Sequence, residues 1–277
     1  MKPALPLIAG LLLGLAAQAV QAYTFGILPQ RSAVLTAQYW NPILDYAGKK
    51  SGVMLELGTR KDALEYSGAE ARGDFDFVYS NHILAPNHAA AGYRVIARPA
   101  GKPIHGQIVT PEDSPLRSLR ELAGREVGFP NKNAFVGYMA PMTALILTGI
   151  TVKPAFGGNQ EGIMAQMRAG QIQAASVNSR VMQEYAAREG FKYRALWTSE
   201  PYLDIPISAH PRVPAAAAQA VRDALTGMAQ NPEGRKILKA SAAVIKQGPP
   251  YGFVPAQDAE YRNQREVYRL IWKQEGR

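Results

Sequence analysis

Short apolar runs alternate almost regularly with longer amphipathic segments along most of this chain. Several runs are apolar almost throughout, as strands buried in a parallel sheet are. Glycine ends several amphipathic segments, where a helix C-cap is expected. Strands alternating with helices predict βαβ units and a mostly parallel sheet. The predicted strands are residues 24–28, 53–57, 75–79, 94–97, 107–109, 126–129, 174–177 and 193–197, with helices at 32–50, 62–72, 134–148, 160–168 and 179–188.

The alternation falls into two blocks, because residues 126–197 repeat the strand and helix order of residues 24–97. The junctions are Pro-Gly-rich at 99–103 and polar at 198–206, as hinge segments are. We therefore expect an α/β fold of two lobes, each a mostly parallel sheet flanked by helices, with a ligand cleft between them. An extended piece at 207–209 and helices at 214–229, 232–243 and 256–272 complete the chain, so that lobe one comprises residues 23–104 and 205–277 and lobe two residues 105–204.

The N-terminus indicates export. Lys2 precedes an uncharged stretch at residues 5–20, and small residues stand around Ala22. This pattern is typical of a cleaved signal peptide, residues 1–22, and predicts a periplasmic protein. A retained membrane anchor is the alternative, but the stretch is short beside the roughly 20 residues of a span.

Composition excludes several classes of protein. The chain has no cysteine, so disulfides, thiolate metal sites, cysteine nucleophiles and lipid attachment at an N-terminal cysteine are all excluded. The net charge is +9, but basic residues are interspersed with acidic ones and never form a run of five. We read this charge as a solvated surface with a bias toward an anionic ligand, and we expect no nucleic-acid partner. We also expect a monomer without cofactor or metal.

The loops after the predicted strands carry the candidate site, because ligands bind beyond the carboxyl ends of parallel strands. These loops are rich in Asn, Gln, Ser, His and Arg and hold no paired carboxylates. Converging hydrogen-bonding groups without a nucleophile–base pair favour recognition over catalysis. The candidate ligand-binding residues are Gln30, Arg31, Ser32, Tyr79, Ser80, Asn81, His82, His105, Asn133, Ala134, Phe135, Val136, Asn159, Gln160, Glu161 and Asn178.

Several candidates have a structural alternative. Asn133 precedes an apolar helix and is a natural N-cap, which would leave the amides of residues 134–136 free to face the cleft. Arg31 and His82 could instead be a surface charge and a core histidine, and Glu161 could only stabilise a helix N-terminus. We expect His88 and His210 at the surface.

Signatures of common enzymes are absent: the sequence has no GxSxG elbow, HExxH, Walker loop or Rossmann GxGxxG. Four scattered histidines without nearby carboxylates do not predict a metal site. We therefore expect no catalytic residues, and a binding protein that is not an enzyme.

The chain from residue 23 onward resembles the PhnD-like substrate-binding proteins of phosphate, phosphite and phosphonate ABC transporters, which are type II periplasmic binding proteins. The resemblance covers nearly all of that length, and it rests on the order and spacing of several short segments. They are 40–46 (WNPILDY), 73–77 (GDFDF), 113–114 (DS), 119–124 (LRELAG), 137–138 (GY), 156–158 (FGG) and 196–199 (LWTS). A divergent branch of the family is indicated by 29–32 (PQRS), 79–82 (YSNH) and 158–161 (GNQE).

The resemblance implies a small-molecule ligand and a membrane permease as partners. It also implies that a Ser-Thr-Ser run holds the phosphonate oxygens, where this chain has Ala134, Phe135 and Val136; a usual histidine is replaced by Gln160. Each lost hydroxyl is worth about 1.5–3 kcal/mol to a charged oxygen. The departures therefore predict that phosphonate of the usual kind binds weakly, and they leave the ligand unnamed.

The expected function is a periplasmic solute-binding protein that captures a small polar or anionic ligand by hinge closure and delivers it to an ABC permease. One alternative is a sensor that signals to a membrane receptor kinase. A periplasmic enzyme on the same fold is another, and it would need a nucleophile–base pair that the sequence does not reveal.

Overall fold

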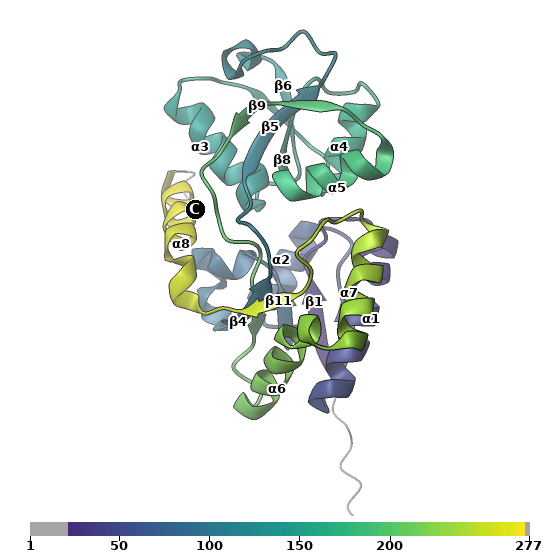
Figure 1. The fold of residues 1–277 in the computed structure, drawn as a ribbon. Coiled ribbons are helices and arrows are strands. Elements are labelled where there is room, and N and C mark those ends of the chain that lie inside the picture. Colours follow the sequence, from purple (N-terminus) through teal and green to yellow (C-terminus); the bar gives the residue numbers. More distant parts are fainter. Residues whose placement is uncertain (1–21, 275–277) are drawn as a thin grey trace, which may run out of the picture.

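The computed structural model describes residues 22–274, which form two α/β lobes, one above the other in Figure 1. We call the lower one lobe one and the upper one lobe two. The predicted signal peptide lies, except for Ala22, outside the described residues, and Ala22 is the first residue of strand β1.

Lobe one is built on a six-stranded sheet in the order β11-β4-β10-β3-β1-β2. Strands β2 and β3 pair in parallel with β1, whereas β10 runs antiparallel to β3 and β4, and β11 antiparallel to β4. The strands are β1 (Ala22–Ile27), β2 (Met54–Gly58), β3 (Phe77–Tyr79), β4 (Arg94–Pro99), β10 (Ile207–Ala209) and β11 (Phe253–Pro255).

Lobe two is built on a five-stranded sheet in the order β7-β6-β8-β5-β9. Strands β7 and β8 pair in parallel with β6, and β5 runs antiparallel to both β8 and β9. The strands are β5 (Gly106–Pro111), β6 (Glu126–Phe129), β7 (Lys153–Phe156), β8 (Ala175–Asn178) and β9 (Tyr193–Thr198).

The two-lobed α/β fold is confirmed, but the expectation of mostly parallel sheets is wrong. Parallel pairing holds where a helix returns the chain to the same edge, as between β1 and β2. The strands next to the lobe crossings run antiparallel, because the chain there passes from one lobe to the other and back. Edge strands β7 and β11 each contain a proline and carry only a weak strand signal, and neither was predicted.

Helices cover both sheets. In lobe one, α1 packs on α6 and α7, while α2 packs on the short helices after β3. Polar side chains begin several helices: Asn159 caps α4 and Asn178 caps α5. No helix among residues 22–274 is long and apolar enough to cross a membrane. The helices are α1 (Ala33–Ser51), α2 (Ala63–Ala71), α3 (Ala140–Leu147), α4 (Gln160–Arg168), α5 (Ser179–Glu189), α6 (Ala215–Thr226), α7 (Pro232–Val244) and α8 (Arg262–Gln274), with short helices η1 (His82–Leu84), η2 (Pro86–Ala91), η3 (Leu119–Leu122), η4 (Phe135–Met139), η5 (Met228–Gln230) and η6 (Asp258–Tyr261).

The helix predicted at 134–148 has two parts. It begins as the π-helix η4, in which the Met139 N–H donates to the Ala134 carbonyl at 3.1 Å, and continues as α3. Pro141, which has no N–H, stands in the first turn of α3, where a helix tolerates it. The π-helix brings its wider turn to the cleft between the lobes.

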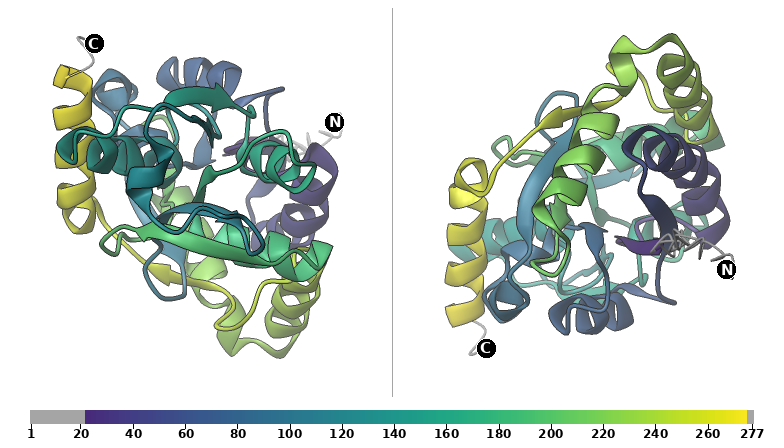
Figure 2. Two further views of the ribbon diagram at one scale, coloured as in Figure 1. Left: turned by 90° about the horizontal axis from the view of Figure 1, so that it is seen from above. Right: turned by 90° about the horizontal axis from the view of Figure 1, so that it is seen from below.

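The two chain crossings between the lobes lie side by side. Ile104 and Tyr202 form an antiparallel bridge, with backbone hydrogen bonds of 2.7 and 2.8 Å. Helix α8 runs along this side of both lobes (yellow in Figures 1 and 2) and contacts η4. There the Phe135 ring packs on Tyr202 and Tyr268, with centroids 4.8 and 5.0 Å apart. A buried aromatic cluster therefore joins the lobes beside the crossings.

Candidate functional site

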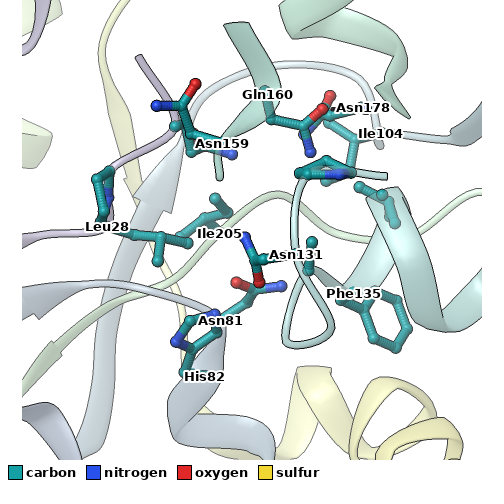
Figure 3. A pocket seen from close by; sticks show the side chains of 16 residues that line it. Leu28, Asn81, His82, Ile104, Asn131, Phe135, Asn159, Gln160, Asn178 and Ile205 are labelled. Carbon is teal, nitrogen blue, oxygen red and sulfur yellow. Dashed lines mark hydrogen bonds between the residues drawn. The ribbon is translucent and has the colours of Figure 1, made fainter. Parts of the chain in front are cut away.

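A small cavity lies between the lobes, where loops after β1 and β3 meet loops after β6, β7 and β8. We call it the carboxamide pocket, because amide side chains dominate its polar lining (Figure 3). Its volume of about 30 Å³ has room for one or two water-sized groups. It is lined by Leu28, Pro29, Gln30, Asn81, His82, Ile104, Pro130, Asn131, Ala134, Phe135, Val136, Gly137, Asn159, Gln160, Asn178 and Ile205.

Four amides of lobe two are held by their oxygens. Each oxygen accepts a hydrogen bond from a nearby backbone N–H, while among the described residues the amide nitrogens donate none. The bonds are Asn133 N–H to Asn131 Oδ1 at 2.9 Å, Gly162 N–H to Asn159 Oδ1 at 2.8 Å, Asn178 N–H to Gln160 Oε1 at 3.0 Å and Arg180 N–H to Asn178 Oδ1 at 3.0 Å. Backbone N–H groups of the loops thus bind the oxygen of each amide, and the amide N–H groups remain available to donate.

Gly137 is required for the position of Gln160. A Cβ atom at residue 137 would lie 2.7 Å from Gln160 Nε2 and 2.8 Å from Pro130 Cγ, closer than real Cβ contacts come. Because glycine stands there, the π-helix backbone approaches the amide directly. Gln160 is only 4% exposed.

Lobe one faces these amides with Asn81 and His82, at the bottom of Figure 3. Oδ1 of Asn81 and both ring nitrogens of His82 are buried and make no well-formed hydrogen bond within residues 22–274, although the Asn81 side chain interacts with the Tyr268 hydroxyl and the His82 ring with the Asn133 backbone. Burial, together with nearby His88, lowers the pKa of His82 from 6.5 to about 3. The imidazole is therefore neutral at physiological pH, and the carboxamide pocket has no charged side chain in its lining.

A second space, the ion-pair compartment, adjoins the pocket at Gln30 and Asn178. Arg31 after β1 pairs with Glu184 of α5, and Arg180 of α5 pairs with Asp204 at the second crossing. The four charges cancel. The compartment is lined by Gln30, Arg31, Tyr39, Trp40, Tyr79, Pro99, Asn178, Arg180, Val181, Glu184, Asp204, Ile245, Gln247 and Phe253.

Burial raises the pKa of Glu184, and the charge of Arg31 opposes that shift. The Glu184 side chain is 4% exposed and that of Arg31 14% exposed. Arg180 also donates from Nη2 to the Lys102 carbonyl at 2.9 Å, so it contacts both crossing segments. The ion pairs therefore hold α5 against lobe one and against the crossings.

Further contacts bring the lobes together near Glu161. Its N–H donates to the Gln30 carbonyl at 3.4 Å, and its carboxylate accepts from the Ser32 N–H at 3.3 Å and from Arg188 at 2.6 Å. The lobes thus touch across the cleft at Gln30, Ser32 and Glu161.

The structure brings many of the predicted site residues together. Gln30, Asn81, His82, Ala134, Phe135, Val136, Asn159, Gln160 and Asn178 line the carboxamide pocket, and Arg31 and Tyr79 line the ion-pair compartment. His105 lines a wider groove of about 720 Å³, where its Nδ1 lies 2.8 Å from the Ser199 carbonyl. Ser32, Ser80, Asn133 and Glu161 line none of these three spaces.

Two local expectations are wrong. Ala134, not Asn133, is the cap residue of η4, and the Ala134 N–H is not free, because it donates to the Asn131 carbonyl at 3.2 Å. Phe135 lines the pocket as expected of a site residue, but its ring points away from it (Figure 3) into the aromatic cluster. His88 is 3% exposed, and is thus not at the surface.

His88 also belongs to an arrangement that the sequence did not reveal. Its Nε2 lies 3.0 Å from Ser67 Oγ, and its Nδ1 lies 3.2 Å from Glu70 Oε1. This is a nucleophile–base–acid order. Ser67 is only 6% exposed, however, and lines none of the three spaces described above.

Sequence reasoning missed Asn131, Glu184 and Asp204. Asn131 lies in a loop already singled out, and a polar residue after β6 was the available signal. Glu184 lies within a helix and Asp204 within the second crossing, so no strand-end rule points to them. Within residues 22–274, no group of three or more His, Cys, Asp or Glu is placed to hold a metal ion.

Comparisons with solved structures place the fold. PhnD1 from Prochlorococcus marinus in complex with methylphosphonate is similar at a TM-score of 0.77 and 16% identity, over 91% of this chain and 99% of that one. A binding protein component of an ABC phosphonate transporter from Pseudomonas aeruginosa is similar at a TM-score of 0.77 and 16% identity, over 91% of this chain and 87% of that one. The periplasmic aliphatic sulphonate binding protein SsuA from Escherichia coli is similar at a TM-score of 0.59 and 13% identity, over 92% of this chain and 87% of that one.

The chain thus shares the fold of type II periplasmic binding proteins, as expected. No curated protein sequence matches the chain significantly. The family model described as "ABC transporter, phosphonate, periplasmic substrate-binding protein" matches residues 25–261. The chain therefore belongs to this family of periplasmic substrate-binding proteins of ABC transporters.

Proposed function

We propose that this protein captures a small polar or anionic solute in the carboxamide pocket, by closure of its two lobes, and delivers it to the permease of an ABC transporter. The observation that carries the proposal is the pocket itself. Both lobes contribute buried hydrogen-bonding groups with unused capacity: Asn81 and His82 from lobe one, and Gln160 and Asn178 from lobe two. Such groups need a partner when the cleft is closed.

The contacts across the cleft support hinge closure. The paired crossings at Ile104 and Tyr202 form a narrow connection, while Arg31–Glu184 is formed by the two lobes themselves. A clamp with these two elements opens by rotating at the crossings and closes by forming the ion pair. The surface of the closed form would then be what the permease recognises.

The solute-binding role is proposed without catalysis. The pocket holds no ionisable side chain other than the neutral His82, and the buried Ser67–His88 pair is separate from it. The protein acts in the periplasm as a monomer, after removal of residues 1–22. Two of the similar structures are a methylphosphonate complex and an aliphatic sulphonate binding protein, which supports a small oxyanion among the ligands to be tested.

A thermal-shift screen of the purified chain tests the proposal, with small anions, amino acids and neutral osmolytes as candidates. A ligand that binds only the native state raises the melting temperature by mass action. Small-angle X-ray scattering of each hit then measures the compactness of the lobes. We expect a saturable rise in Tm that Gln160→Ala removes and that Gln171→Ala, at an exposed position beyond the far end of α4, leaves intact.

Turnover of a hit into product would contradict the binding role. A screen in which no small solute shifts Tm would contradict capture in the cleft.

A further inference from the structure

We propose that Tyr268 of α8 is a positioning residue of the carboxamide pocket: its hydroxyl holds the amide nitrogen of Asn81, so that the Asn81 oxygen is left to accept a hydrogen bond from the solute. The inference rests on the function proposed above and adds a specificity-determining residue from outside the pocket lining. It follows from how α8 contacts the pocket-lining segments of both lobes.

The first step concerns the place of α8, which runs along both lobes (yellow in Figure 1). In lobe one, Arg265 Nη1 donates to the carbonyl of Ile83 at 3.2 Å, and Ile83 follows the pocket residue His82. In lobe two, the Phe135 ring at the start of η4 stacks on Tyr268, with centroids 5.0 Å apart and ring planes 28° from parallel. Helix α8 therefore supports one pocket-lining segment from each lobe.

Helix α8 is itself fixed by buried and charged contacts. Gln264 Nε2 donates to the Leu203 carbonyl of the second crossing at 3.0 Å, and Arg265 Nη2 pairs with Asp258 at 2.7 Å. Gln264 and Tyr268 are each only 1% exposed. The Tyr268 hydroxyl, on the buried face of α8, therefore has a defined position relative to the pocket.

The second step concerns the orientation of Asn81, which is 7% exposed and lines the pocket. Burial, together with nearby Glu70, raises the pKa of Tyr268 well above its ordinary value, whereas its interaction with the Asn81 side chain opposes that rise. A neighbour that lowers the pKa of a tyrosine donates to its oxygen, so the amide nitrogen of Asn81 faces the hydroxyl. The Asn81 oxygen, in contrast, makes no well-formed hydrogen bond within residues 22–274.

The third step concerns what this orientation gives the pocket. The four amides of lobe two are bound through their oxygens and offer N–H donors, whereas Asn81 of lobe one offers an acceptor. The closed pocket thus suits a small solute that has both an acceptor oxygen and an N–H or O–H donor. Without the Tyr268 hydroxyl, the Asn81 amide is free to turn and to present its nitrogen instead.

Tyr268→Phe tests the role, because it removes only the hydroxyl and keeps the ring that stacks on Phe135. The first measurement needs no solute. In nuclear magnetic resonance spectra the side-chain amide protons of Asn81 should exchange with solvent about tenfold faster in the variant than in the wild type, because they lose a buried acceptor.

Formate and formamide test specificity, because these two very small solutes have nearly the same shape but only formamide carries N–H donors. Nuclear magnetic resonance titrations measure the affinity of each. We expect Tyr268→Phe to raise the ratio of formate affinity to formamide affinity by about tenfold, because the turned Asn81 amide meets acceptor oxygens with a donor. A merely structural role would weaken both solutes by the same factor.

Tyr93→Phe is the matched control. It also removes a buried tyrosine hydroxyl of lobe one, which donates to the Phe75 carbonyl at 2.7 Å, and Tyr93 lines none of the three spaces described above. This variant should lower Tm and leave the affinity ratio unchanged. In an Asn81→Ala background, Tyr268→Phe should change neither affinity further, because Tyr268 acts through Asn81.

Unchanged exchange of the Asn81 amide protons in Tyr268→Phe would overturn the inference, while the function of solute capture would stand. An unchanged affinity ratio, or a further loss in the Asn81→Ala background, would have the same consequence. If neither probe binds although the broad screen finds another solute, the inference alone fails. If neither probe binds and no solute raises Tm, the proposed function fails as well.

Discussion

The carboxamide pocket and the ion-pair compartment adjoin each other, but their buried polar groups differ in whether they have partners within the protein. The compartment contains four charges, and each has its partner within the protein. The pocket contains no charge, and its four lobe-two amides accept through their oxygens but donate no hydrogen bond among the described residues. The compartment is complete without a ligand, whereas the pocket is not. We infer that the first serves closure and the second recognition.

The energies of the two regions differ accordingly. A buried ion pair contributes little net stability relative to apolar side chains, but loss of one partner costs about 3–5 kcal/mol. Hydrogen bonds from neutral donors to a charged ligand contribute about 1.5–3 kcal/mol each. We therefore expect selectivity to depend on the pocket and the position of the open–closed equilibrium to depend on the compartment.

The largest expected effect comes from breaking the Arg31–Glu184 pair. Glu184→Gln leaves Arg31 buried without a counter-charge, which should disfavour the closed form by about 3–5 kcal/mol. The lobes should open to hydrate the arginine, and small-angle scattering of the ligand-free protein should show a larger radius of gyration. The double variant Arg31→Met/Glu184→Leu should be compact again.

Arg168→Met provides the control, because Arg168 pairs with Glu189 at the surface of lobe two. Exposed pairs contribute about 0–1 kcal/mol, so this variant should resemble the wild type. A Glu184→Gln variant as compact as the wild type would remove the pair from the closing contacts.

The neutral state of His82 should appear as a pH dependence of stability. Its pKa is about 3 in the folded protein and 6.5 ordinarily, so the unfolded chain binds the proton first. The free energy of unfolding is then full above pH 6.5 and falls on acidification toward pH 3, by up to about 1.4 kcal/mol per pH unit. Urea titrations at several pH values should show a shallower acid slope for His82→Gln.

The ring itself provides an independent measurement. In nuclear magnetic resonance spectra the imidazole of His82 should stay neutral at pH values well below 6.5. A His82 pKa near its ordinary value would mean that water reaches the ring, and that lobe one does not close this side of the pocket.

A smaller effect is expected from filling the space at Gly137. In Gly137→Ala the added methyl group must displace Gln160 Nε2 and Pro130, which typically costs about 1–3 kcal/mol. The displaced amide should also weaken ligand binding, as measured by calorimetry. Gly248→Ala, where a Cβ meets nothing within 4 Å, should change neither quantity by much.

The smallest effect separates the two roles of Asn159. Asn159→Ala removes the cap of α4 and should lower the free energy of unfolding by about 1 kcal/mol. Asn159→Asp keeps the cap acceptor and should keep that stability in denaturant titrations. Equal losses in both variants would show that the amide nitrogen, not the oxygen, stabilises the helix.

The sequence predicted the order of elements well where the local signal was strong. The helix at 160–168 is found with the predicted bounds, because Asn159 marks its start and an apolar face follows it. The π-helix after Asn133 was not predicted, because its hydrogen bonds depend on how residues 134–139 pack between β5 and α8. The antiparallel strands at the crossings likewise depend on contacts between segments distant in sequence.

The site shows the same division. The rule that ligands bind beyond the carboxyl ends of strands selected loops that do meet at the carboxamide pocket. It could not show that Arg31 faces Glu184, because 153 residues separate them in the sequence. Nor could it distinguish amides with free donors from amides with free acceptors, since that depends on which backbone N–H each oxygen reaches.

The sequence by itself determined the α/β alternation, the absence of thiol chemistry and the loops rich in amide side chains, and it predicts export. These features are local, and residue type alone sets their physical chemistry. Only the tertiary structure decided that the charges of the cleft cancel one another and that the amides present donors, because pairing and orientation arise when the two lobes meet.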